Sequence, residues 1–110
     1  MIDLLEKIYM NIEEQKTTAN SMQTWGIKRA NAEYDYQTAL SQDVLVDRDK
    51  GTAIGVIQLT CKGKVDIAKK RLERDIADVM YEVSKEKIQI LKKEQNTLEN
   101  QAQREWSVRE

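Results

Sequence analysis

The residues best suited to catalysis or metal binding are few in this chain, and their spacing matches no standard site. The 110 residues include no histidine and a single cysteine, Cys61. Histidine is the commonest metal ligand and the side chain that titrates near neutral pH. Cys61 has neither a histidine partner nor a nearby acidic residue to orient one, so it lacks what activates a nucleophilic thiol. The composition therefore predicts a protein that is not an enzyme.

Two short segments partly match ligand-binding loops, and both fail at required positions. A calcium-binding loop starting at Asp47 would have Gly51 at its fifth position and Gln58 at its twelfth, where oxygen ligands are needed. The segment "KGK" (62–64) matches the end of a phosphate-binding loop. Its first glycine is replaced by Gln58 and its final Ser or Thr by Val65. We therefore predict no catalytic residue, no metal site and no cofactor.

Positive charge is concentrated between residues 62 and 74. This segment contains only two acidic residues, and its cations are Lys62, Lys64, Lys69, Lys70, Arg71 and Arg74. A cluster of this kind could contact the phosphates of a nucleic acid or a nucleotide. The alternative is a solvated helix face with internal ion pairs, because Asp75 and Asp78 follow immediately.

The overall composition favours long helices in a soluble protein. Charged residues make up 34% of the chain, the net charge is -1, and there is no proline, which would interrupt a helix. The balanced charge does not drive the whole chain toward nucleic acid or membrane. The sequence predicts no signal peptide, because Asp3 and Glu6 lie where its apolar core would begin. We expect a cytoplasmic protein, with Cys61 reduced.

The first arm of the chain predicts a long helix over residues 2–46. Its apolar residues recur at helical spacing, at Leu5, Ile8, Ile12, Ala19, Met22, Ala30, Leu40 and Val44. Gly26 interrupts this arm and costs up to about 1 kcal/mol relative to alanine. The arm is therefore either one helix or two pieces that bend near Trp25 and Gly26, and we favour one helix.

The second arm predicts a helix over residues 64–106. Steps of three and four residues place one set of apolar side chains on one face: Val65, Ala68, Leu72, Ile76, Val79, Val83, Leu91, Leu98 and Ala102. Oppositely charged residues four positions apart, such as Asp66 and Lys70, each add roughly 0.2–0.5 kcal/mol to helix stability.

The segment between the arms predicts a short apolar helix over residues 52–62. Gly51 can end the first helix, Thr52 can cap the next and Gly63 can end it. One side of this helix would carry Ile54, Ile57 and Cys61. A strand is the alternative, because Ile, Val and Thr favour strands. A single strand would have no partner in this sequence, so we favour the helix.

Together these elements predict an all-α protein with one domain, residues 1–110. Two long antiparallel helices are joined by a short apolar elbow helix, which makes a helical hairpin. A hairpin buries only one stripe of each helix, and small cores are marginally stable. Self-association or a larger partner could cover the remaining apolar surface, and we expect a homo-oligomer that also binds another protein.

Aromatic and basic residues mark the predicted partner-binding surface. Trp and Tyr on a helix surface are favoured anchors at protein interfaces. The residues that we expect to contact a partner are Trp25, Tyr34, Lys69, Lys70, Arg71, Arg74 and Trp106.

Several segments are similar to a group of small helical proteins encoded by phages and prophages of Gram-positive bacteria. The similarity is carried by "YQTAL" (36–40), Gly51, Gly63, "RLERDIADVMY" (71–81) and "LENQAQREW" (98–106). The resemblance implies a phage context without an established activity. In that context small non-enzymatic proteins often block host defence or nuclease proteins, or assist phage recombination.

The sequence therefore leads to three functional hypotheses, none of which involves catalysis. The first is a phage-encoded protein that inhibits a host protein through contacts of its helix faces. The second is a nucleic-acid-binding accessory factor that uses the basic segment. The third is a structural phage component that assembles through its helices. No membrane contact is expected.

Overall fold

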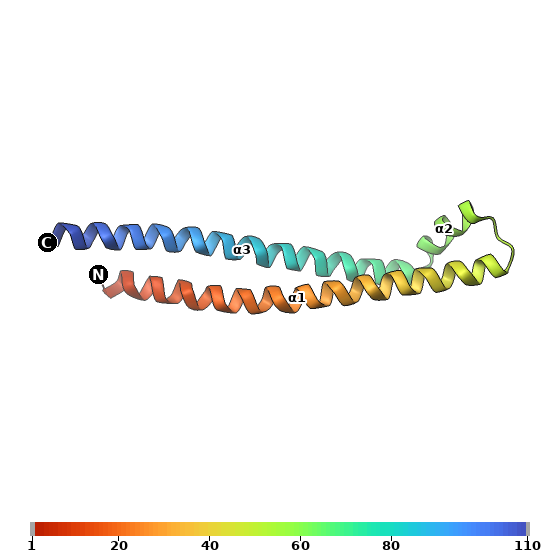
Figure 1. Cartoon of the computed structure of the whole chain (residues 1–110), viewed down its shortest axis with the longest axis horizontal. Coiled ribbons are helices and arrows are strands. Elements are labelled where there is room, and N and C mark those ends of the chain that lie inside the picture. The colour runs from red at the N-terminus through yellow and green to blue at the C-terminus, as the bar shows by residue number, and fades with distance from the viewer. Residues whose placement is uncertain (1, 110) are drawn as a thin grey trace. The chain divides into compact units, whose positions relative to one another are not determined.

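The chain folds into three helices, and the computed structural model describes residues 2–109. Helix α1 spans Ile2–Asp49, helix α2 spans Ile54–Gly63 and helix α3 spans Val65–Arg109 (Figure 1). The helices α1 and α3 pack against each other in opposite directions, and α2 connects them. The predicted all-α hairpin is confirmed, and the alternative of a strand in the connecting segment is wrong.

The contacts divide the chain into two compact units. The elbow unit consists of Trp25–Met80, and the terminal unit consists of the described residues up to Thr24 and from Tyr81 onward. Helix α1 is continuous through Gly26, so the prediction of one long first helix is confirmed.

In the terminal unit, the interface between α1 and α3 is unusually polar. Its buried residues include Asn11, Thr18 and Ser84 beside the apolar Leu4 and Leu91. The side chain of Asn11 donates a hydrogen bond to Glu94 (3.5 Å) and accepts one from Gln15 (2.7 Å), and Gln15 also donates to Gln95. Polar residues at such positions specify the alignment of the two helices at a cost in stability.

The residues of α3 that face α1 in this unit repeat every three or four positions. They are buried or half-buried, in the order Tyr81, Ser84, Ile88, Leu91, Gln95, Leu98 and Ala102. This average spacing of 3.5 residues is the repeat of a coiled coil, in which each helix keeps one face toward its partner. The terminal unit is therefore a coiled-coil-like pair of helical segments.

In the elbow unit, the two long helices meet around Tyr36 and Ala77, which are both buried. Two ion pairs flank this contact: Arg29 lies 3.6 Å from Asp78, and Arg74 lies 3.5 Å from Glu33. The guanidinium of Arg74 also lies over the Tyr36 ring, 4.6 Å from its centroid. Around Tyr36, small and charged residues of α3 thus form its contact with α1, and the large apolar Ile67 is buried nearer the elbow.

The end of α1 is set by Gly51, which has a φ of 82° in the left-handed region. Its N–H donates to the carbonyl of Arg48 (3.0 Å), and the N–H of Thr52 donates to that of Asp47 (3.3 Å). These two bonds form a Schellman motif, which ends a helix by satisfying its last carbonyls. The predicted stop at Gly51 is confirmed. The predicted cap at Thr52 is wrong, because α2 begins after Ala53 and no described side chain caps it.

Helix α2 buries Ile57 and Cys61 completely, as expected for two of the three residues predicted on its inner side. The side chain of the third, Ile54, lies outside the described residues. The helix ends at Gly63, as predicted. Lys64 then has extended backbone (φ -67°, ψ 141°), and its carbonyl accepts the N–H of Ala68 at the start of α3 (2.8 Å). A single residue therefore joins α2 to α3.

The predicted core stripe of α3 is wrong over its first half. Val65, Leu72 and Val79 are 81%, 58% and 59% exposed, and Ile76 and Val83 are also exposed. The stripe is correct from Leu91 onward, where Leu91 and Ala102 are buried. The error has a physical cause: this half of α3 carries two stripes on opposite faces, and apart from Ile67 its contact with α1 uses smaller and more polar side chains.

A smaller correction applies to α1. Of its predicted core residues, Leu5, Ala19 and Ala30 are exposed, whereas Ile8, Ile12, Met22, Leu40 and Val44 are half-buried. The residues that are most buried instead are Leu4, Asn11, Thr18 and Tyr36. These follow the 3.5-residue repeat of a coiled coil, and the polar members hid it in the sequence.

None of the helices in the described chain combines the length and the apolar composition needed to cross a bilayer.

Candidate functional site

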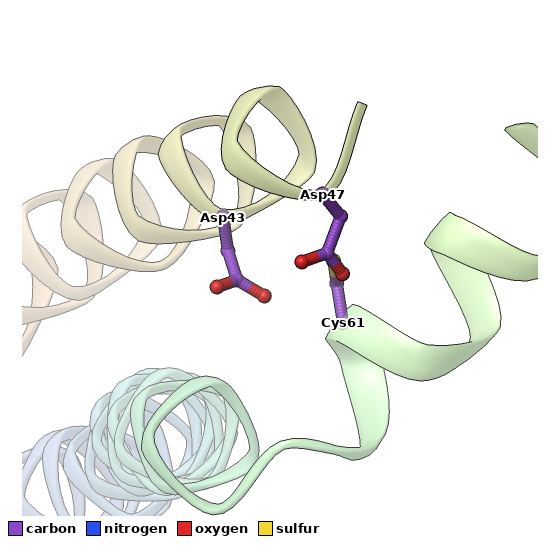
Figure 2. A group of neighbouring side chains, drawn as sticks. All are labelled: Asp43, Asp47 and Cys61. Carbon is purple, nitrogen blue, oxygen red and sulfur yellow. The ribbon is translucent and has the colours of Figure 1, made fainter. Parts of the chain in front are cut away.

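A cluster of polar side chains lies where the three helices meet in the elbow unit. Asp43 and Asp47 project from the same side of α1, one turn apart, and Cys61 approaches Asp47 from α2 (Figure 2). The thiol of Cys61 donates a hydrogen bond to Oδ2 of Asp47 over 3.4 Å. Both Cys61 and Asp47 are buried, so this cluster is part of the packed interior of the unit.

Lys64, the residue between α2 and α3, completes the cluster. Its Nζ lies 2.8 Å from Oδ2 of Asp43 and 3.3 Å from each carboxylate oxygen of Asp47. Oδ2 of Asp43 is buried and accepts no well-directed hydrogen bond from the described residues, so the ammonium charge is its main compensation. Lys64 thereby ties the start of α3 to the end of α1.

The cluster shifts the pKa values of Asp43, Lys64 and Cys61. The Lys64 ammonium lowers the pKa of Asp43, and the Asp43 carboxylate in turn raises the pKa of Lys64. Burial, reinforced by the hydrogen bond to Asp47 and by the nearby Asp43 carboxylate, raises the pKa of Cys61 to about 12. The thiol therefore stays protonated at neutral pH, and a protonated thiol is neither a nucleophile nor a metal ligand.

The same geometry argues against a cation site at this position. One ligand atom from each of Asp43, Asp47 and Cys61 lies within 4.8 Å of the others, a spacing that a metal ion could accept. The Lys64 ammonium, however, already contacts both carboxylates and supplies the compensating positive charge. We therefore interpret the cluster as a structural lock of the elbow. The sequence did not reveal it, because its members come from three different elements.

A groove on the elbow unit combines apolar and cationic side chains. It has a volume of about 740 Å³ and is lined by Tyr36, Gln37, Leu40, Ser41, Val44, Leu45, Lys62, Arg71 and Arg74. Leu40, Val44 and Leu45 supply its apolar surface. The three cations come from α2 and α3, and none of the described lining residues is a carboxylate. A ligand for this surface would therefore be apolar with negative charge at its edge.

The cations of the groove differ in how they are held. Arg74 is half-buried over Tyr36 and pairs with Asp75 (3.0 Å) and Glu33 (3.5 Å). Burial opposes the charge of Arg74, but a hydrogen bond to Asp75 and the charge of that carboxylate outweigh burial and raise the pKa of Arg74. Lys62 and Arg71 have no ion pair with any described residue and thus keep their charge available at the groove.

The predicted partner-binding residues are only partly brought together. Arg71 and Arg74 line the groove, whereas Lys69 is exposed on another side of α3 and Lys70 is half-buried. Tyr34 is 71% exposed on α1 and does not line the groove.

The two tryptophans do not line the groove either. Trp25 is half-buried with Lys28 Nζ 4.5 Å from its ring centroid, and Trp106, 53% exposed, belongs to the terminal unit. Tyr36, Lys62 and Leu45 were not predicted as groove residues. Their helical spacing was visible, but their convergence depends on how α1, α2 and α3 pack.

The exposed apolar face of α3 is the second candidate surface. We call it the outer stripe, and it consists of Val65, Leu72, Ile76, Val79, Val83 and Ile90. Leu72 and Ile76 each lie two positions from Arg74, which is about 200° around a helix of 3.6 residues per turn. Since Arg74 packs toward α1, the outer stripe in the elbow unit faces away from α1.

Comparisons of the chain with protein families, with curated proteins and with solved structures found no match. Its function is therefore inferred from the two surfaces described above.

Proposed function

We propose that this protein is a non-enzymatic binding protein whose elbow-unit groove receives an apolar, acidic segment of a partner protein. The observation that carries the proposal is the lining of the groove. Leu40, Val44 and Leu45 lie beside Lys62 and Arg71, and the described lining includes no carboxylate. Apolar contacts would supply affinity, and the two unpaired cations would select a partner with acidic residues.

A protein partner fits this surface better than a nucleic acid does. Phosphate binding depends on several cations presented together, whereas the cations of the basic segment lie on α2, on the linking residue Lys64 and on different sides of α3. Lys69 and Arg71 lie about 200° apart on the helix. Lys64 and Arg74 are engaged by carboxylates of their own chain. The apolar part of the groove would have no role against a phosphate backbone.

The biological context that we propose comes from the resemblance of the sequence to small phage and prophage proteins. In that context the partner would be a host protein of a defence or nuclease system, and binding would inhibit it. The groove supports this hypothesis only in that it offers a surface for a protein. A phage accessory factor that binds nucleic acid is the competing hypothesis.

The proposal is tested by capturing partners from a lysate of a Gram-positive bacterium on the immobilised protein. Wild-type protein is compared with K62E/R71E, which reverses the two unpaired cations of the groove. The matched control is K85E/K92E, which makes the same change in charge at two exposed lysines away from the groove. We expect a defined protein to be captured by the wild type and the control, and its recovery to fall by at least about tenfold with K62E/R71E.

Two results would contradict the proposal. One is equal capture by K62E/R71E and the wild type. The other is capture that disappears after nuclease treatment and falls steeply with added salt, which would instead favour the nucleic-acid-binding hypothesis.

A further inference from the structure

The outer stripe of α3 has the residue spacing of a coiled-coil interface. In the elbow unit, no described part of this chain covers it. Its residues Leu72, Ile76, Val79 and Val83 follow one another at steps of four, three and four. Val65 and Ile90 continue the same seven-residue repeat on either side. Such a repeat of apolar residues keeps one face of a helix toward a second helix.

The pattern at the core positions of this repeat is self-complementary when two α3 helices run antiparallel. If the two-fold axis passes between Ala77 and Asp78, Ile76 of one copy meets Val79 of the other, and Leu72 meets Val83. Further out, Val65 meets Ile90. Every apolar residue of the stripe is thereby opposed by another apolar residue, and no large apolar side chain faces a polar one.

The two charged core positions of the repeat support the same arrangement. Lys69 and Glu86 occupy positions of the stripe that would otherwise be apolar. In the antiparallel arrangement Lys69 of one copy meets Glu86 of the other. Both are exposed and have no ion pair with any described residue of their own chain. A second copy thus supplies the partner that each charge lacks.

A parallel pair of α3 helices would place the same charges in opposition. Lys69 would face Lys69 of the second copy, and Glu86 would face Glu86. Like charges placed opposite each other in an interface disfavour the arrangement. The antiparallel pair has one similar cost beside the stripe, where Asp75 lies near Glu82 of the second copy. That cost is reduced because Arg74 already pairs with Asp75 at 3.0 Å.

We propose that the outer stripe is covered by a second copy of this chain, with the two α3 helices antiparallel and Lys69 paired with Glu86. The self-complementarity favours a second copy over an unrelated protein. An unrelated partner would not require the apolar residues and the two charges to match under a two-fold axis. The surface is separate from the groove, because Lys62, Arg71 and Arg74 are not part of the outer stripe.

The proposal is tested by exchanging the two charges and measuring the dimer dissociation constant by sedimentation equilibrium. K69E places a glutamate against Glu86 of the second copy, and E86K places a lysine against Lys69. We expect each single variant to weaken the dimer by at least about tenfold, and K69E/E86K to restore an affinity close to that of the wild type. The two positions are 17 residues apart in the sequence, about 25 Å along α3, so the rescue cannot arise within one chain.

K85E is the matched control, because it changes the net charge as K69E does at an exposed position outside the outer stripe. It should leave the dissociation constant unchanged. Circular dichroism should show the same helix content in all variants. The proposal is overturned if the wild type is monomeric at about 100 µM, well above a micromolar dissociation constant. It is also overturned if the single variants bind as the wild type does, or if the double variant fails to restore binding. Capture of a host protein in the groove experiment would not depend on any of these results.

Discussion

At the scale of single residues, the clearest feature is the lock formed by Lys64. Its ammonium contacts Asp43 and Asp47 on α1, while its backbone joins α2 to α3. Cys61 adds a buried hydrogen bond from α2 to Asp47. Two carboxylates one turn apart would repel each other, so the lysine is what makes this arrangement stable. The lock fixes how α2 and α3 leave the end of α1.

The lock predicts how stability depends on pH. The pKa of Asp43 is lowered in the folded protein, so its contribution is present above its unfolded value of 3.8 and is lost as the pH falls through the lower, folded value. The pKa of Lys64 is raised, so its contribution is present below 10.5 and is lost as the pH rises through the higher, folded value. The raised pKa of Cys61 adds to the alkaline loss between 9.0 and about 12.

We expect Lys64→Met to lower the free energy of unfolding at pH 7 by a small but measurable amount, because the ion pairs it removes are partly exposed. Urea denaturation of both proteins from pH 2.5 to 7 checks this. The difference should shrink as the pH falls below 3.8 toward the lowered pKa of Asp43, because protonation of that carboxylate removes its interaction with Lys64. A difference that stays constant across this range would show that Lys64 acts through packing alone.

This lock could not be found from the sequence. There, Asp47 matches only part of a calcium loop, and Cys61 stands out only as a lone thiol. The partners that the structure gives them, Asp43 and Lys64, belong to no motif with them, and the members of the lock come from separate elements. The spacing of four residues between Asp43 and Asp47 was visible, but it indicates nothing until a cation is placed between them.

At the scale of elements, helix ends and lengths follow from local chemistry and could be predicted. The absence of proline and the apolar periodicity indicated the three helices, and Gly51 indicated the end of α1. Which face of α3 meets α1 could not be predicted, because α3 has two stripes. The stripe that is more apolar in sequence, which includes Leu72 and Val79, is exposed. The matching charges of Arg74 with Glu33 and of Arg29 with Asp78 were the available sign of the true contact face.

The two glycines at the ends of α1 and α2 should respond differently to substitution. Gly51 has a positive φ, which costs a residue with a Cβ about 1–2 kcal/mol, so Gly51→Ala should destabilise the protein by that amount. Gly63 has a negative φ, and an alanine Cβ there would meet no described atom within 4 Å beyond its local backbone. Gly63→Ala should therefore be neutral or stabilising by up to about 1 kcal/mol. Thermal denaturation of the two variants measures the contrast. Equal effects of the two substitutions would contradict the conclusion that the left-handed backbone conformation of Gly51 ends α1.

At the scale of the whole molecule, the two candidate surfaces have different chemistry. The groove of the elbow unit has unpaired cations beside leucine and valine, which suits an acidic partner segment. The outer stripe of α3 is apolar with one cation and one anion, which suits a second α3. The interface between α1 and α3 is comparatively polar in both units. The most apolar face of α3 is therefore left for association.

The central claim is that the outer stripe of α3 is an association surface and not part of the core of the hairpin. The most direct test is the sedimentation mass of the wild type and of L72Q/I76Q/V79Q, with helix content recorded for both. We predict twice the chain mass of 12.8 kDa for the wild type and a single chain mass for the variant, with helix content retained. A monomeric wild type, a variant that stays dimeric, or a variant that loses its helices would contradict the claim.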